Sequence, residues 1–562
     1  MTSDKKGIAL LTEIFVKKGL KQIVISPGSR NAPIIISFAQ HPKIKAISIV
    51  DERSAAFFAL GMAQQTKQTV AIACTSGTAA LNYAPAIAEA YYQKVPLLVL
   101  TADRPEELID QGDGQAIRQK NVYANYIIKS FELPQEISNE ADFNFAEKII
   151  NEAINLTQYP DFGPVHINIP FNEPLYNQVE KHSFEANIFE PVIKPKSIPE
   201  EKIKEFAERW NGYEKKLLIA GMMDTNTRLE EILNKIADDP SVVLLTETIS
   251  NLKNSCTCPC IDRVVSTILP EEIENFRPVL LVTFGGQVIS KMVKAFIRKN
   301  KPLEHWHIDP IDFQMDTYQC LTSGIPVKPT SFFSQILPLV KPKKSKFNFN
   351  WIERDKRSEN RYAQFLSKCE FSDLKVFETI LKAIPKGSNL QMGNSTPVRY
   401  VQLFKPFQKL TYNSNRGTSG IDGTVSTAAG AAYVSKKPTT IITGDLGFFY
   451  DSNALMNNYL SENLRIIIIN NSGGGIFRFI PGPGETDQLE EFFETKHDWK
   501  AEFIAKNFNI HYYSANHLNS LNTSLEKFYK LQPNNKPAIL EVFTPNEKNA
   551  VTLKEYFKYL KF

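Results

Sequence analysis

Two polar loops in the last third of the sequence have a spacing that could bind a divalent cation. The loop GDLG (444–447) follows the apolar run TTIIT, and the loop NNSGG (470–474) follows the run RIIII. Asp445 and Asn471 lie 26 residues apart, about one strand–helix–strand unit, so both are expected at one edge of a parallel sheet. A carboxylate, an amide oxygen and a loop carbonyl such as that of Gly473 are hard donors that suit Mg²⁺. Each loop alone could be a polar turn, but together they favour a metal site.

Three loops in the first third place small, polar and cationic residues after expected strands. SPGSRNAP (26–33) presents Ser29 and Arg30 where a helix could begin, which suits an anion, although a capped turn with a surface arginine explains it equally well. TADRP and the following QGDGQ place Arg104 and Gln115 beyond another strand. CTSGT (74–78) would let a ligand approach the backbone closely, but simple turn chemistry explains it too.

An acidic pair, Asp51 and Glu52, follows a further expected strand and precedes an Ala-rich helix. Acidic residues are favoured in the first turn of a helix by the helix dipole, so the pair can be purely structural. A functional carboxylate at the end of a strand is the alternative interpretation, and by itself it is the weaker one.

The elements that must position these loops alternate along the whole chain. Strands that are continuously apolar, rather than alternating, predict parallel sheets covered by helices on both faces. The sequence therefore predicts an α/β protein of three consecutive doubly wound, mainly parallel-sheet domains, over residues 1–180, 190–345 and 360–562. The Pro- and Lys-rich stretches EPVIKPKSIPEEK (190–202) and KPKKSK (341–346) mark the expected crossings.

The composition excludes several classes of protein. The 562 residues carry 65 Lys and Arg against 61 Asp and Glu, a net charge of +4, which is too small for a protein that coats nucleic acid. No apolar run is long enough to span a membrane and no signal peptide is evident, so a cytoplasmic location is expected. The CTCPC cluster (256–260) lacks the second half of a zinc motif, which favours reduced thiols over a metal site.

The GDLG and NNSGG loops at this spacing resemble the metal- and diphosphate-binding motif of thiamine-diphosphate (ThDP) enzymes, with Leu446 where glycine is usual. The resemblance implies a pyrimidine-binding domain, a central domain and a diphosphate-binding domain, in that order. It also implies a homodimer or homotetramer, in which the cofactor lies between the first domain of one subunit and the last domain of another.

Within this superfamily, the chain is most similar to the 2-succinyl-5-enolpyruvyl-6-hydroxy-3-cyclohexene-1-carboxylate synthases of menaquinone biosynthesis. The segments that carry this resemblance extend over nearly the full length: SPGSRNAP (26–33), DERSAAF (51–57), CTSGTA (74–79), TADRP (101–105), GNSTPVR (393–399), SNRGTSGIDG (414–423), GDLGFFYDSNAL (444–455) and NNSGGGIF (470–477). The implied reaction is ThDP-dependent decarboxylation of 2-oxoglutarate and addition of the succinyl carbanion equivalent to isochorismate.

The resemblance also implies a role for individual residues. The implied catalytic residues are Glu52, Gln115 and Arg30. The implied cofactor-binding residues are Glu52, Ser395, Gly417, Ile421, Asp445, Asn471, Ile476 and Phe477, of which the apolar ones could equally be plain core. Asp445, Asn471 and Gly473 would bind Mg²⁺ or Mn²⁺. The implied substrate-binding residues are Ser29, Arg30, Arg104, Gln115, Lys291, Arg399 and Arg416. The chain departs from the family pattern at Gly114 and Met292, where Asn and Arg are common.

Two rival functions stay open. Another ThDP enzyme, such as a 2-oxoacid decarboxylase or an acetolactate synthase, would share the cofactor motif, but the many pocket arginines favour two dianionic substrates. A ThDP-fold binding protein without activity is the second rival, and the intact Glu52, Asp445 and Asn471 argue against it.

Overall fold

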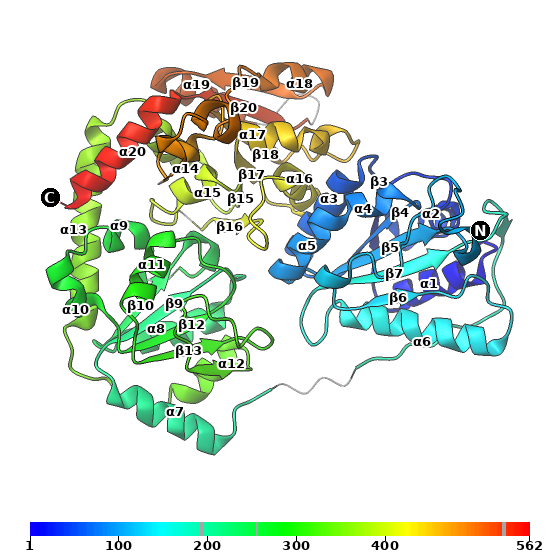
Figure 1. Ribbon diagram of the computed structural model, residues 1–562, viewed down its shortest axis with the longest axis horizontal. Coiled ribbons are helices and arrows are strands. Elements are labelled where there is room, and N and C mark those ends of the chain that lie inside the picture. Colours follow the sequence, from blue (N-terminus) through cyan, green and yellow to red (C-terminus); the bar gives the residue numbers. More distant parts are fainter. Residues whose placement is uncertain (192–195, 254–256, 408, 481, 531–535, 562) are drawn as a thin grey trace.

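The computed structural model describes residues 1–562 except 192–195, 254–256, 408, 481, 531–535 and 562. Three six-stranded sheets follow one another along the chain, and every strand pair within them is parallel. In Figure 1 the first unit (blue to cyan) lies at the right, the middle unit (green) at the lower left, and the third (yellow to red) at the top.

The first sheet has the strand order β3-β2-β4-β5-β7-β6. Its strands are β2 (Gln22–Ile25), β3 (Lys45–Ser48), β4 (Val70–Cys74), β5 (Leu97–Asp103), β6 (Ser130–Glu132) and β7 (Pro164–Pro170). Its helices are α1 (Lys6–Lys17), α2 (Ala32–Gln40), α3 (Glu52–Thr66), α4 (Thr78–Asn82), α5 (Ala84–Gln93) and α6 (Glu140–Leu156). A short antiparallel pair, β1 (Thr2–Ser3) with β8 (Gln178–Val179), joins the two ends of this unit.

The middle sheet has the order β11-β10-β9-β12-β13-β14. Its strands are β9 (Lys216–Ala220), β10 (Val242–Thr246), β11 (Thr257–Cys258), β12 (Leu280–Phe284), β13 (Glu304–Ile308) and β14 (Ser323–Ile325). Its helices are α7 (Glu200–Gly212), α8 (Thr227–Ala237), α9 (Ile261–Val265), α10 (Ile273–Phe276), α11 (Lys291–Lys299) and α12 (Pro329–Ile336).

The third sheet has the order β16-β15-β17-β18-β20-β19. Its strands are β15 (Asn389–Met392), β16 (Thr411–Ser414), β17 (Thr439–Gly444), β18 (Leu464–Asn470), β19 (His511–Ala515) and β20 (Ala538–Phe543). Its helices are α13 (Phe347–Lys368), α14 (Asp373–Ala383), α15 (Thr396–Val401), α16 (Thr424–Val434), α17 (Asp445–Tyr450), α18 (Ala501–Asn507), α19 (Leu518–Phe528) and α20 (Asn546–Lys561).

The first and third sheets repeat one topology. In each, the chain begins at the second position, adds the edge strand beside it, and then crosses to the other side of the first strand. The point of reversal lies between β2 and β4 in the first sheet and between β15 and β17 in the third. Ligands of open α/β sheets bind outside the carboxyl ends of the strands at such a point, so the topology directs attention to the loops after these strands.

Helices α3 and α16 pack the first unit directly against the third. Their crossing depends on two glycines, because a Cβ on Gly61 would overlap the Thr427 carbonyl oxygen and one on Gly430 would lie 2.7 Å from the carbonyl carbon of Phe58. Side chains from both sheets, such as Val24 and Ile466, belong to one continuous buried core. The first and third units of the chain are therefore packed directly against each other.

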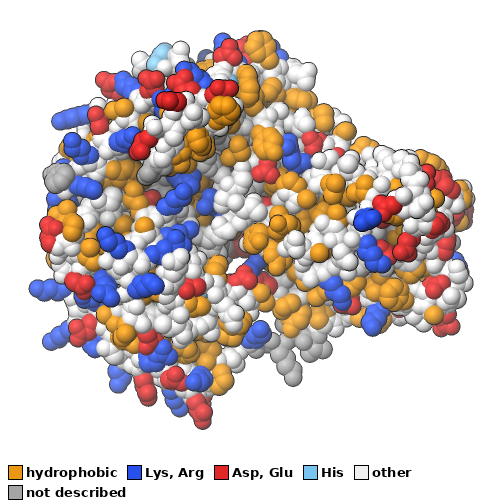
Figure 2. Space-filling model, in the orientation of Figure 1, with side chains coloured by type: hydrophobic (Ala, Val, Ile, Leu, Met, Phe, Trp, Pro, Cys, Tyr) orange, Lys and Arg blue, Asp and Glu red, His pale blue; other side chains and the backbone are white. Residues whose placement is uncertain are grey.

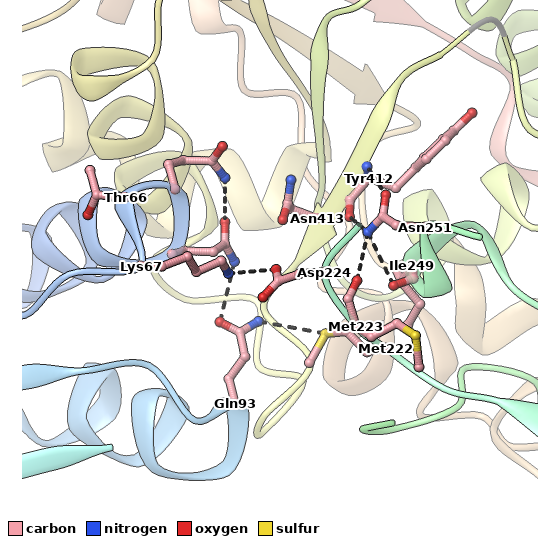
Figure 3. A network of polar contacts seen from close by, with 12 residues as sticks. Thr66, Lys67, Gln93, Met222, Met223, Asp224, Ile249, Asn251, Tyr412 and Asn413 are labelled. Carbon is pink, nitrogen blue, oxygen red and sulfur yellow. Dashed lines mark hydrogen bonds and ion pairs between the residues drawn. The ribbon is translucent and has the colours of Figure 1, made fainter. Parts of the chain in front are cut away.

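Polar contacts join all three units where they meet (Figure 3). Lys67, just beyond α3, forms an ion pair of 2.6 Å with Asp224 of the middle unit. Gln93, the last residue of α5, donates to the carbonyl of Ser414 in β16 at 2.7 Å. Asn251 and Tyr412 exchange two hydrogen bonds of 2.9 Å between the middle and third units.

The predicted α/β class with three consecutive parallel sheets is confirmed. The helical stretch after β4 divides into α4 and α5 around Tyr83, since Pro85 has no N–H to continue the helical bonding. Helix α13 places Trp351 in the core of the middle unit and Leu366 in that of the third. The domain limits expected at 180–190 and 345–360 stay predictions.

The remaining expectations concern cysteines, membranes and charge. Cys258 and Cys260 are buried free thiols, and Cys256 lies outside the described residues. Among the described helices, none is long and apolar enough to cross a membrane. Figure 2 shows acidic and basic side chains interspersed over the visible face, as the small net charge of +4 leads one to expect.

Candidate functional site

The loops after β15, β17 and β18 converge at the carboxyl edge of the third sheet. Ser395 precedes α15, Asp445 opens α17 directly after β17, and Asn471 follows β18. The strands are parallel and neighbours in the sheet, which is why loops from three separate segments reach one place.

Asp445 and Gly473, two of the predicted metal ligands, are in contact. The Asp445 carboxylate is almost fully buried and accepts the Gly473 N–H at 2.9 Å and the Leu446 N–H at 2.7 Å. Asn471 uses its amide nitrogen to approach Asp373 at 3.4 Å, while its buried Oδ1 has no hydrogen-bond partner in the described part of the chain. An orphaned amide oxygen beside a buried carboxylate fits a hard cation such as Mg²⁺, which would satisfy both.

Two side chains beside these ligands were missed by the sequence analysis. Asp373, at the start of α14, is buried and accepts the Thr544 hydroxyl at 2.6 Å. Burial raises its pKa to about 6, hydrogen bonds from Thr544 and Asn471 oppose the shift, and the charge of Asp445 adds to it. The second, His497, brings Nε2 to 3.4 Å from Asp445 Oδ2.

His497 is held by its neighbours rather than by a recognisable motif. Its ring stacks on Trp499, with ring centroids 4.4 Å apart, and its backbone N–H donates to the Ser472 carbonyl at 3.2 Å. The surrounding TKHDW has no pattern that signals a site. Only the path of the chain after β18 brings it to Asp445.

The Gly-rich loop after Asn471 has a shape that needs glycine. Gly473 has φ 145°, and a Cβ there would lie 2.6 Å from the Glu494 carbonyl oxygen. Gly474 donates to that same oxygen at 2.7 Å, which fastens the loop. Ile476 and Phe477 follow in a short 3-10 helix, both half-buried, with the Phe477 ring 5.6 Å from that of Phe493.

Two predicted substrate-binding arginines contact the loop after β15. Arg416 is 7% exposed and donates to Asn394 Oδ1 at 2.9 Å, and Arg399 donates to the Ser395 carbonyl. Burial lowers the pKa of both guanidinium groups, and Arg399 lowers that of Arg416 further. Desolvated cations so close together create a region that favours a dianionic ligand.

Lys291 is exposed at the start of α11, whereas Lys294, one turn later, is half-buried. Burial lowers the pKa of Lys294, the charge of Glu247 opposes this shift, and that of Arg416 adds to it. Lys294 therefore extends the cationic region from the middle unit. No motif in the sequence marks Lys294 as a site residue.

The corresponding loops of the first sheet also converge. Arg30 is 5% exposed and donates to the Phe171 carbonyl at 3.1 Å. Burial is the main cause that lowers the pKa of Arg30, and the nearby charge of Arg104 lowers it further. Arg104 donates to the Gly114 carbonyl at 2.9 Å, beside Gln115. Ser29 and Gln115 are exposed, so both are available to a ligand.

Two close approaches hold these first-unit loops together. A Cβ on Gly28 would lie 2.7 Å from a methyl carbon of Thr75, and one on Gly77 would lie 3.2 Å from the Cα of Gln115. The hydroxyls of Thr75 and Ser76 are buried without a hydrogen-bond partner among the described residues. Unsatisfied donors at this sheet edge are available to a ligand.

Glu52 and Ile421 lie near the junction of the two units. Glu52 is the first residue of α3 and is half-buried. Burial is the main cause that raises the pKa of the Cys74 thiol, and the charge of Glu52 raises it further. The backbone oxygen of Ile421 lies 3.6 Å from where a Cβ on Gly447 would stand, and its apolar side chain is 37% exposed.

Gly417 is fixed by the first unit of the same chain. Its N–H donates to a carboxylate oxygen of Glu89 at 2.6 Å, and the Thr418 N–H and hydroxyl donate to the other at 2.7 and 2.8 Å. Glu89 is 1% exposed, and burial raises its pKa while these hydrogen bonds oppose the shift.

Comparison with known proteins bears directly on this arrangement. The chain is 47% identical over 555 residues to the 2-succinyl-5-enolpyruvyl-6-hydroxy-3-cyclohexene-1-carboxylate synthase of Flavobacterium johnsoniae, covering 98% of each chain. The chain belongs to this synthase family. The synthases of Flavobacterium psychrophilum and Porphyromonas gingivalis are 45% and 39% identical, over 98% and 99% of this chain and 98% of each relative.

Two family models agree with this assignment. Residues 5–122 match "Thiamine pyrophosphate enzyme, N-terminal TPP binding domain", and residues 193–392 match "Middle domain of thiamine pyrophosphate". Thiamine pyrophosphate is another name for ThDP. The synthase family is thus a ThDP family, and the predicted resemblance is confirmed.

Proposed function

We propose that the chain catalyses the ThDP-dependent decarboxylation of 2-oxoglutarate and the addition of the resulting four-carbon unit to isochorismate, giving 2-succinyl-5-enolpyruvyl-6-hydroxy-3-cyclohexene-1-carboxylate. The observation that carries the proposal is the full-length similarity to synthases of that name, and it is supported by two groups of cations that would suit dianionic substrates. We place the reaction in menaquinone biosynthesis and in the cytoplasm, as expected from the sequence.

The cofactor would be held from both units. Asp445, Asn471 and the Gly473 carbonyl would hold Mg²⁺ or Mn²⁺ on the diphosphate, and the orphaned Oδ1 of Asn471 supports this assignment. Glu52 would bind the pyrimidine ring, and the remaining contacts would come from Ser395, Gly417, Ile421, Ile476 and Phe477. When bound, ThDP supplies the electron sink for decarboxylation of a 2-oxo acid.

The substrates would be held by residues of all three units. Both are dianions, so each carboxylate needs a cation or a strong hydrogen-bond donor. Arg399, Arg416 and Lys291 would bind from the middle and third units. Arg30, Arg104, Ser29 and Gln115 would bind from the first, where Arg30 and Gln115 are proposed to contact the reacting groups.

A homodimer or homotetramer is part of this proposal. Val50 and Tyr450 lie near Glu52 and are 57% and 53% exposed, and Ile421 is 37% exposed. Apolar side chains exposed beside a catalytic carboxylate are accounted for if a second subunit covers them. We therefore propose that Glu52 acts with the Asp445 and Asn471 of the partner subunit.

The activity is tested by incubating the purified protein with ThDP, Mg²⁺ and 2-oxoglutarate, with and without isochorismate. The wild type is expected to form the product with isochorismate and to release little CO₂ without it. Glu52→Gln is expected to show neither product formation nor CO₂ release. Rapid CO₂ release from 2-oxoglutarate without isochorismate would indicate a 2-oxoacid decarboxylase. In a parallel incubation, turnover of pyruvate alone would indicate an acetolactate synthase. Absence of turnover with any of these substrates would favour a binding protein.

A further inference from the structure

Three side chains with metal-ligating atoms lie together at the edge of the middle sheet, apart from the site described above. His305 lies in β13, and Asp316 and Cys320 lie in the loop that connects β13 to the edge strand β14. One imidazole nitrogen, one carboxylate oxygen and the thiol sulfur all lie within 4.8 Å of one another. The loop places Cys320 four residues after Asp316, and the Cys320 N–H donates to Asp316 Oδ1 at 3.0 Å.

His305 provides an independent indication of a ligand. Its side chain is fully buried, and its Nε2 lies 2.8 Å from the Thr283 hydroxyl of the adjacent strand. Its Nδ1 has no hydrogen-bond partner among the described residues and lies 3.8 Å from Asp316 Oδ1. A buried ring nitrogen normally has a partner, so this one is directed at a place that a ligand would fill.

The contact of the second ring nitrogen also suits a metal ligand. When Nε2–H donates to the Thr283 hydroxyl, which can in turn donate to His307 Nδ1 at 2.8 Å, the lone pair of His305 is on Nδ1. Metal-ligating histidines are held by such a bond from their second nitrogen.

We propose that His305, Asp316 and Cys320 bind one Zn²⁺ ion, with water as the fourth ligand. Imidazole, carboxylate and thiolate are the three kinds of side chain that bind Zn²⁺, whereas the oxygen donors around Asp445 and Asn471 suit Mg²⁺. Asp316 and Cys320 are partly exposed, which gives the ion a path of entry and leaves room for the water. Binding breaks the S–H bond of Cys320, forms a Zn–S bond and releases the proton to solvent.

The ion would fasten the loop between β13 and β14. The loop already returns to β13 through Thr322, which donates its N–H to the His305 carbonyl at 2.9 Å. The Zn²⁺ ion would add a connection from the side chains of the same loop to the same strand. Its role is therefore structural and does not involve the reacting groups.

The test is titration of the metal-free full-length protein with Co²⁺ as a spectroscopic substitute for Zn²⁺. The expected result is a thiolate-to-Co²⁺ charge-transfer band in the near ultraviolet that saturates at one ion per chain and disappears when Zn²⁺ is added. The Cys320→Ser variant should lose the band. Cys369→Ser is the matched control, because Cys369 is also a partly exposed free thiol outside the cluster, and it should keep the band.

Two further variants separate this site from others. Thr283→Val removes the hydroxyl that contacts both His305 Nε2 and His307 Nδ1, and the loss of the first contact should weaken Zn²⁺ binding by about 10- to 100-fold. Asp445→Asn should leave the band unchanged, since that residue belongs to the Mg²⁺ site. Absence of the band in the wild type, or the same band in Cys320→Ser, would overturn the proposal.

Discussion

Replacing Gly61 with alanine perturbs the contact that holds the first and third units together. The new Cβ would overlap the Thr427 carbonyl oxygen and would lie 2.9 Å from the Ala431 nitrogen, both backbone atoms of α16 that cannot rotate away. The helices must therefore separate along their crossing. Overpacking of this kind costs about 1–3 kcal/mol, against a gain of up to about 1 kcal/mol in helix propensity. The expected net result is destabilisation by about 1–2 kcal/mol.

The assay is thermal unfolding of the wild type and the variant under the same conditions. A loss of this size should lower the Tm by several degrees, about 2–4 °C per kcal/mol for a unit of this size. Gly212→Ala is the matched control, because Gly212 ends α7 and a Cβ there has no heavy atom within 4 Å. It should leave the Tm unchanged or raise it slightly.

A second variant tests whether the effect arises at the crossing. Gly430→Ala would place its Cβ 2.7 Å from the carbonyl carbon of Phe58, at the same helix pair. Once the helices have separated, the second alanine should cost less than it does alone, so the double variant should be more stable than the sum predicts. An unchanged Tm in Gly61→Ala, or strict additivity, would refute the reasoning.

Three further predictions concern the third unit. Asp445→Asn should weaken Mg²⁺-dependent ThDP binding, measured by calorimetry, by about 10- to 100-fold, because Asp445 is a buried predicted metal ligand. The control Asp498→Asn, at an exposed position, should bind ThDP as the wild type does. Equal ThDP affinities of Asp445→Asn and the wild type would exclude Asp445 from the metal site. Mg²⁺ and ThDP together should change the fluorescence of Trp499, because its ring stacks on that of His497 beside Asp445. Trp499→Phe should abolish this change. A change that persists in the variant would come from the buried tryptophans and would contradict the prediction. Burial raises the pKa of Asp451 to about 7, so the folded state keeps a proton that the unfolded chain releases. The free energy of unfolding should therefore decrease by up to about 4 kcal/mol as the pH rises from about 4 to 7. Thermal unfolding of Asp451→Asn should show a smaller dependence on pH over this range. The same pH dependence in the wild type and the variant would contradict this prediction.

The central strands of each sheet could be predicted from the sequence because they are buried on both faces. Strands β9 and β18 contain the apolar runs LLIA and IIII, and every residue of both strands is buried. Strands β6, β11, β14 and β19, which carry no such apolar run, all lie at a sheet edge. An edge strand pairs on one side only and is short or partly polar, so periodicity gives little signal for it.

The candidate site likewise contains residues that the sequence predicts and residues that it does not. The loops around Asp445 and Asn471 could be found because their residues follow predictable strands at a fixed spacing. Asp373 and His497 lie in segments without a motif, and only the packing of α14 and of the chain after β18 brings them to Asp445. The crossing at Gly61 was missed for a related reason, since nothing local distinguishes a glycine that faces another unit from one in an ordinary helix.

Subunit complementation tests the central claim that two chains build one cofactor site. Glu52→Gln and Asp445→Asn chains carrying different tags would be co-expressed, and mixed dimers would be isolated through both tags. If the site lies between subunits, each mixed dimer has one intact site and one doubly substituted site, so it should show about half the wild-type activity while each parent variant shows none. Inactive mixed dimers would place Glu52 and Asp445 in the same chain's site and contradict the account.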